Sequence, residues 1–146
     1  MGQLLVVRLN GFRRRLAACR RGASIVEFAF VLPILATMLF GVLMYGNYFF
    51  LAHNVQQLAN DAARSSIAGL TSKERADLAN ETVMVEASNG LPIDIARLQI
   101  ALTDHDQFVT VRVSYDASDS SIFRVGLLPL PDPVISRTAA VRMGGL

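Results

Sequence analysis

Cysteine, histidine and tryptophan are nearly absent from the 146-residue chain, which has one Cys, two His and no Trp. A single Cys cannot form a disulfide within the chain, so a disulfide-stapled fold is excluded, as are zinc sites built from several Cys. Charged residues make up only 18% of the chain, whereas apolar residues reach 52%. This composition argues against intrinsic disorder, which needs few apolar residues and many charges.

The few charges are separated along the chain. Residues 1–22 contain six Arg and no acid, so their side chains sum to +6, while the rest of the chain sums to −4. No formal charge occurs between Phe28 and Asn60. The net charge of +2 therefore conceals three predicted parts: a basic leader at 1–22, a transmembrane helix at 23–51 and a soluble domain at 52–146.

The segment from Phe28 to Leu51 predicts the membrane crossing. Its 24 residues would form a helix about 36 Å long, and the hydrocarbon core of a bilayer is roughly 30 Å thick. A buried helix of a soluble protein is the alternative, but the residues after it are too few to surround it. Pro33 is expected to kink this helix. The Arg residues that precede the span predict a cytoplasmic N-terminus and a C-terminal domain on the other side of the membrane, which in a bacterium is the periplasm.

The junction between leader and span carries a processing pattern. Gly22 is followed by Ala23, and Glu27 is the fifth residue after the Gly–Ala bond. A secretory signal peptide fits poorly, because the apolar stretch is too long and no A-x-A site follows it. Residues 16–19 match a lipobox, in which Cys19 would be lipidated, but a lipobox must end an apolar stretch and this one precedes it.

The run from Arg21 to Pro33 resembles the start of the TadE-like family. The shared features are Arg-Gly at the cut, Val-Glu-Phe after it, and a Pro six residues beyond the Glu. Residues 135–142 are also similar to the family. The major Flp pilin is a poorer match, because it is much shorter and typically has Tyr where this chain has Phe28.

This resemblance implies a minor pilin or pseudopilin of the tight-adherence (Flp, type IVc) pilus, which helps to initiate or assemble the fibre. A prepilin peptidase would cut between Gly22 and Ala23, and the helix would remain in the mature protein. Glu27, with Phe28 beside it, would then act in pilin assembly by pairing with the new N-terminus of a neighbouring subunit. The implied partners are the prepilin peptidase, the major Flp pilin, a sister pseudopilin and the lipid of the inner membrane.

Helical patterns continue beyond the span. Apolar residues recur at intervals of three and four from Leu51 to Ser65, which predicts that the membrane helix extends into water and stops near Gly69. The opposite face is polar and carries Asn54, Gln57, Asn60, Asp61 and Arg64.

A second helix and a sheet are predicted after this stem. Thr71 and Glu74 fit a capping box, and Asn89-Gly90 would end that helix. Strand-like alternation then predicts a hairpin over 98–115 and a third strand over 134–143, with 117–133 as a loop. The expected fold is therefore α+β, a pilin-like lollipop in which a long helix leads into a three-stranded antiparallel sheet.

No catalytic or cofactor site is recognisable. His105 lies between Asp104 and Asp106, but this spacing is typical of a polar turn rather than of a metal site. The sequence has no phosphate-binding loop and no nucleophile motif, so we expect no enzyme, cofactor, metal or small-molecule substrate. Nucleic acid is not an expected partner, because the adjacent span explains the Arg cluster at 13–15. The alternative function is an unprocessed, signal-anchored periplasmic adaptor or binding domain.

Overall fold

The structure is a computed structural model that describes residues 20–105, 107–124, 129 and 131–144. The basic leader up to Cys19, the lipobox alternative and Asp106 of the predicted turn lie outside the described residues. The chain divides into two compact units, Met1–Val42 and Leu43–Leu146.

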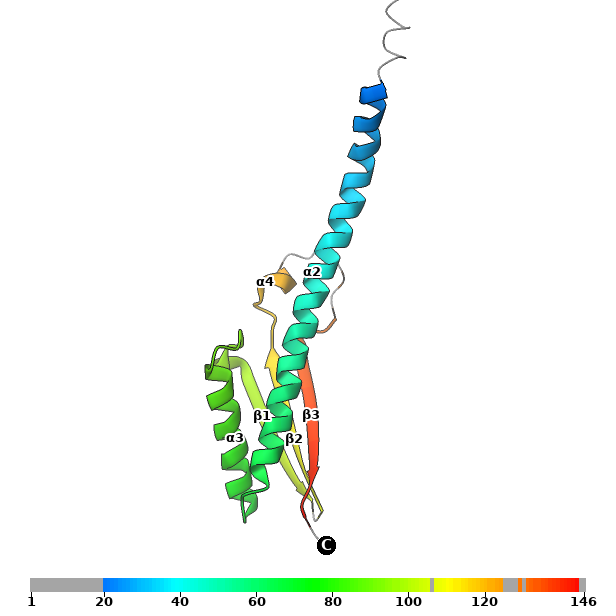
Figure 1. The fold of residues 1–146 in the computed structure, drawn as a ribbon. Coiled ribbons are helices and arrows are strands. Elements are labelled where there is room, and N and C mark those ends of the chain that lie inside the picture. The colour runs from blue at the N-terminus through cyan, green and yellow to red at the C-terminus, as the bar shows by residue number, and fades with distance from the viewer. Residues whose placement is uncertain (1–19, 106, 125–128, 130, 145–146) are drawn as a thin grey trace, which may run out of the picture. The chain divides into compact units, whose positions relative to one another are not determined.

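The element order confirms the predicted α+β class, with a long helix, a second helix and three strands (Figure 1). The elements are α2 (Arg20–Ser66), α3 (Ser72–Ser88), the 3₁₀ helix η1 (Ile95–Arg97), β1 (Leu98–His105), β2 (Phe108–Asp116), α4 (Ser121–Arg124) and β3 (Val134–Arg142). The helix predicted to cross the membrane and continue into water is therefore one element, α2.

The three strands form one antiparallel sheet in the order β1-β2-β3. The hairpin joins β1 and β2 with His105 opposite Phe108, and Val113 of the central strand pairs with Ile100 on one side and Arg137 on the other. The predicted hairpin and third strand are confirmed. They were predictable because alternating apolar side chains indicate a sheet with one buried face.

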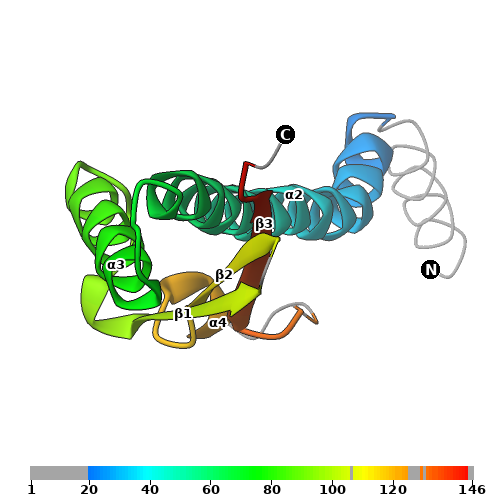
Figure 2. The ribbon, with the colours of Figure 1, turned by 90° about the horizontal axis from the view of Figure 1, so that it is seen from below.

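One face of the sheet packs against the helices. Val109, Val111 and Val113 of β2 have no solvent exposure, and each such fully buried side chain contributes roughly 1.5–3 kcal/mol. α3 lies beside β1, and α2 lies beside β3, where the Gln56 side chain donates to the Thr138 carbonyl oxygen at 3.4 Å (Figure 2). The core combines residues of α2, α3 and the sheet; its fully buried helical members include Val55, Leu58, Ala59, Ala62, Ala63, Ala79 and Val83.

The predicted polar face of α2 is wrong at one residue. Asn54 is only 5% exposed, although its neighbour Gln57 is exposed as expected. The cause is tertiary: the end of α3 and the segment after it cover this side of α2, where Glu86, Asn89 and other residues line a small groove. A helical pattern cannot show which side of a helix a later element will cover.

The end of α2 differs from the prediction in position and in mechanism. The helix ends at Ser66, three residues before the expected stop at Gly69. Ser66 is buried, and its hydroxyl donates to the Ala63 carbonyl oxygen at 2.7 Å. Gly69 does not adopt a left-handed conformation; a Cβ atom built on it would lie 2.7 Å from the backbone nitrogen of Arg75. Gly69 is therefore needed for close approach of two backbone segments.

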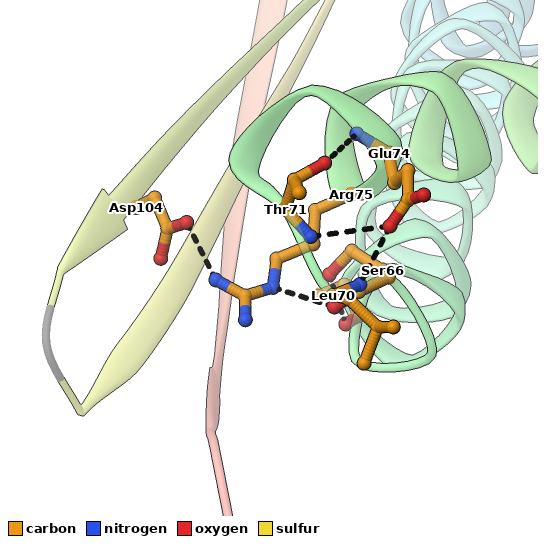
Figure 3. Close-up of polar contacts among 8 residues, drawn as sticks. Ser66, Leu70, Thr71, Glu74, Arg75 and Asp104 are labelled. Atoms are coloured by element: carbon orange, nitrogen blue, oxygen red, sulfur yellow. Dashed lines mark hydrogen bonds and ion pairs between the residues drawn. The ribbon is translucent and has the colours of Figure 1, made fainter.

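The corner between α2 and α3 is held by a polar cluster that Figure 3 shows. The predicted capping box is confirmed: the Glu74 backbone N–H donates to the Thr71 hydroxyl at 3.2 Å, and the Glu74 carboxylate accepts from the Thr71 N–H at 3.2 Å. Arg75 then links the corner to the sheet, with its Nη1 2.6 Å from Asp104 Oδ2. At the far end of α3, Gly90 has a φ of 91°, which explains the stop expected at Asn89-Gly90.

The sequence pattern missed two short helices, η1 and α4. Asp94 caps η1 by accepting from the Ala96 N–H at 3.0 Å, and α4 lies in the segment predicted as loop. Arg97 forms ion pairs with Asp94 and Asp119, which tie η1 to the segment before α4. Single turns such as these have no periodic signal, because they are too short to show one.

Candidate functional site

The N-terminal part of α2 presents apolar side chains on every side. Phe28, Phe30, Ile34 and Met38 are between 59% and 75% exposed, and no residue from Gly22 to Val42 is buried. Water does not stabilise a helix that is apolar all round, so this segment requires lipid or other apolar helices around it. It is the one helix, among the residues described, that is long and apolar enough to cross a membrane.

The compact C-terminal unit begins inside the uncharged stretch. Met44 is 6% exposed and Leu51 is 4% exposed, so both belong to folded protein rather than to a lipid-facing helix. The Tyr45 hydroxyl donates to the Pro129 carbonyl oxygen at 2.6 Å, and the ring of Tyr48 packs edge-on against Phe123. Tyr side chains are typical of the membrane–water interface, because the ring is apolar and the hydroxyl is polar.

These contacts shorten the segment available to lipid. Counting from Gly22 to Leu43, the exposed helix would be about 33 Å long, which still spans a hydrocarbon core of roughly 30 Å. The sequence could not show this boundary, because Tyr45 and Tyr48 contact residues that lie some 80 positions later in the chain.

Gly22 and Ala23, the residues of the predicted cleavage site, both lie within α2. A Cβ atom built on Gly22 would meet nothing within 4 Å, and the backbone there is not left-handed. The fold therefore has no requirement for glycine at this position.

Glu27 lies five residues further along the same helix, on an exposed position beside Phe28. No ion pair joins Glu27 to another residue within the part of the chain that the structure describes. It is the sole acid among residues 20–60. A lone carboxylate on an apolar helix surface is costly in a membrane unless it finds a partner.

Pro33 is accommodated inside α2, which continues through it. Proline has no N–H, so the backbone hydrogen bond to the carbonyl four residues earlier is lost. One turn later, the Thr37 hydroxyl donates to the Pro33 carbonyl oxygen at 2.7 Å. Hydroxyls that bond back in this way are known to bend helices slightly.

Asp104, one of the residues around His105 that were considered as metal ligands, has a structural role at the hairpin. Asp104, next to His105, is the ion-pair partner of Arg75 and is mostly buried, so its carboxylate supports the corner of the fold. Within the described residues, no group of three His, Cys, Asp or Glu is placed to hold a metal ion. His53 is exposed on α2 and contributes to no cluster of this kind.

Comparison with known proteins identifies the N-terminal part of the chain. No curated protein and no solved structure matches the chain. Residues 22–64 match the family model described as TadE-like protein. This finding confirms the resemblance expected from the residues between Arg21 and Pro33. The chain is thus similar to this family over residues 22–64, which make up most of α2.

Proposed function

We propose that the chain is the precursor of a minor pilin or pseudopilin that helps to initiate or assemble a Flp (type IVc) pilus. In this proposal a prepilin peptidase removes the Arg-rich leader by cutting between Gly22 and Ala23. The mature protein stays in the inner membrane through α2, with its N-terminus at the cytoplasmic face and its sheet domain in the periplasm. It has no catalytic role of its own and takes neither cofactor nor small-molecule substrate.

The observation that carries the proposal is the start of the family match. The match begins at residue 22, which is the residue before the predicted cut. The open surroundings of Gly22 are compatible with this proposal, since the fold itself does not require glycine there. Six Arg residues before this point satisfy the positive-inside rule for a cytoplasmic leader.

Cleavage would also supply a partner for Glu27. The cut creates an α-amino group on Ala23, and such a group carries a positive charge at neutral pH. In a bundle of pilin helices, the exposed Glu27 carboxylate of one subunit can pair with the new N-terminus of its neighbour. Such a buried pair contributes register and specificity more than net stability. The proposed partners are accordingly the major Flp pilin and a sister pseudopilin.

Mass spectrometry of the membrane-extracted protein, co-expressed with a matching prepilin peptidase, tests the proposal. We expect a mature N-terminus at Ala23. Gly22→Leu should leave the precursor intact, whereas Gly46→Leu, at a second glycine with open surroundings, should be processed as usual. An intact Met1 on the wild-type protein under these conditions would reject processing and favour the unprocessed periplasmic adaptor.

Protease protection tests the orientation separately. In intact spheroplasts, added protease should digest the sheet domain and leave the α2 segment near Gly22 protected. Protection of the sheet domain would show the reverse orientation and would contradict the assembly role proposed here.

A further inference from the structure

Four aromatic rings gather where α2 enters the C-terminal unit. The ring centroid of Phe49 lies 6.5 Å from that of Tyr45 and 5.7 Å from that of Tyr48. The ring of Tyr48 in turn lies 6.4 Å from that of Phe123. Three of these rings belong to α2, whereas Phe123 comes from α4, which lies beside α2 (Figure 1). We call Tyr45, Tyr48, Phe49 and Phe123 the aromatic cluster.

The cluster adjoins an apolar surface that the folded unit leaves uncovered. Leu43, Phe49 and Phe50 are 59%, 64% and 52% exposed, although α2 is already buried on its other side. Beyond Phe50 the exposed surface changes in character, because every exposed side chain of α2 from His53 to Arg64 is polar or charged. The exposed surface therefore turns from apolar to polar inside the compact unit, and packing within that unit does not account for the uncovered Phe rings.

The same residues fall where the hydrocarbon core of a bilayer would end, a step that rests on the proposed membrane anchoring through α2. About 20 helical residues cross a core of roughly 30 Å. Glu27 is the sole acid among residues 20–60, and a charge is costly within the core, so the count starts at Phe28 and ends at Asn47. Tyr45 and Phe49 are each within two residues of that end.

Aromatic rings at this level suit the interfacial layer of a bilayer. Tyr is enriched at membrane–water interfaces, and segments that lie in the interface bury Phe and Leu at the boundary between headgroups and acyl chains. The polar atoms of the cluster need no further partner, since the Tyr45 hydroxyl donates to the Pro129 carbonyl oxygen at 2.6 Å. Arg124, next to Phe123, is paired with Asp119 at 3.3 Å, so the contact does not depend on anionic lipid.

We propose that the aromatic cluster, together with Phe50, is a membrane contact of the C-terminal unit, with its rings in the interfacial layer of the phospholipid. The occupant is lipid because this surface continues the apolar helix that the bilayer would surround. α4 brings Phe123 to the same layer, so the unit touches the membrane through two segments, α2 and α4. Two contacts fix the orientation of the sheet domain relative to the membrane, whereas a single helix would let it turn.

Tryptophan fluorescence tests this contact, because the wild-type chain has no Trp. Single-Trp variants of the full-length protein are reconstituted into phosphatidylcholine nanodiscs, with and without bromine on the upper part of the acyl chains. Phe49→Trp and Phe123→Trp should lose emission in the brominated lipid and be shielded from iodide in the water.

Phe108→Trp is the matched control. Phe108 is 45% exposed and begins β2 at the hairpin, and the nine residues of this strand put it about 26 Å from the end that leads to α4. Its Trp emission should be unaffected by brominated lipid and quenched by iodide.

A third reporter separates failure of this contact from failure of the membrane anchor. Met38 is 71% exposed near the middle of the counted core, so Met38→Trp should be quenched by brominated lipid whenever α2 spans the bilayer. If Met38→Trp is quenched while Phe123→Trp behaves like Phe108→Trp, the contact through α4 is overturned and a protein partner for the cluster is favoured. If Met38→Trp is not quenched, the membrane anchor is rejected and this inference with it.

Wild-type protein provides a second measurement if a Trp variant does not fold. A nitroxide on the lipid headgroup should broaden the NMR signals of the backbone amides of α4 more than that of Phe108. Equal broadening at both places, or none at α4, would also overturn the proposal.

Discussion

Gly69→Ala is predicted to destabilise the C-terminal unit, although a glycine-to-alanine change in a loop often stabilises a protein. The added Cβ would lie 2.7 Å from the backbone nitrogen of Arg75 and 2.9 Å from its Cγ. That nitrogen donates to the Thr71 carbonyl oxygen at 3.0 Å, and Arg75 Nε donates to the Gly69 carbonyl oxygen at 3.0 Å. The clash is with backbone inside a hydrogen-bonded turn, so a simple rotamer change cannot relieve it.

Two opposing effects set the magnitude of this change. Overpacking of a tightly packed site costs about 1–3 kcal/mol. Replacing Gly by Ala reduces the entropy of the unfolded chain, which stabilises the fold by about 0.4–1 kcal/mol where the backbone is compatible, as it is at Gly69. Subtracting the two ranges gives a net loss in the free energy of unfolding of up to about 2.6 kcal/mol, with a central value of about 1.3 kcal/mol. For a unit of this size, each kcal/mol lowers the Tm by roughly 4–8 °C.

Pulse proteolysis in increasing urea measures this loss on the full-length protein in detergent, because cleavage reports the unfolded fraction of the domain. Gly46→Ala is the matched control: a Cβ there meets nothing within 4 Å, and the residue is inside a helix, where Ala is preferred to Gly by about 1 kcal/mol. The control should be as stable as wild type or more so. A Gly69→Ala protein with unchanged or increased stability would refute the close-approach explanation of this corner.

Three further predictions concern Glu27 in pilin assembly, the carboxyl group of Glu86 and the buried face of the sheet. Glu27→Gln should leave membrane insertion and processing at Gly22 intact but impair co-purification with other pilins; normal piliation would contradict the role proposed for this carboxylate. Glu86→Gln should be more stable than wild type near neutral pH, because burial and the nearby Asp61 raise the pKa of Glu86 in the folded state. The stability of the wild-type protein is then full below about pH 4.5, the unfolded value, and falls as pH rises through the folded pKa. The difference in urea midpoint between the variant and wild type should therefore vanish in acid. Val111→Ala, at a fully buried position of β2, should cost roughly 2 kcal/mol in urea unfolding, and a loss below about 0.5 kcal/mol would show that the sheet face is not the tight core described here.

The elements that sequence reasoning predicted correctly are those with a local signal. The capping residues Thr71 and Glu74 and the left-handed Gly90 mark the ends of α3, because each acts within a few residues of its own position. The strand alternation of β2 is visible for the same reason: the period of two is a property of one strand with one buried face.

The features that sequence reasoning missed depend on contacts between distant segments. Asn54 is polar and lies on the expected polar face, yet α3 and the residues after it bury it. Asp61 and Glu86 become neighbours by the same packing. Gly69 was expected to stop a helix through its backbone conformation, but its importance comes from the proximity of Arg75. None of these facts has a periodic or motif signature.

The uncharged stretch from Phe28 to Asn60 serves two different environments, and charge alone cannot divide it. Up to Val42 every apolar side chain that is large remains exposed, as lipid or a pilin bundle requires. From Met44 onward one side of α2 is buried: Met44, Leu51, Val55 and Leu58 are at most 6% exposed, whereas Phe49 and Phe50 remain more than half exposed. The uncharged stretch extends beyond Val42 because the second half of α2 also buries an apolar face in a small core. An unpaired charge is costly there, as it is in lipid. One-sided burial that begins at Met44 therefore marks the start of the C-terminal unit more clearly than charge does.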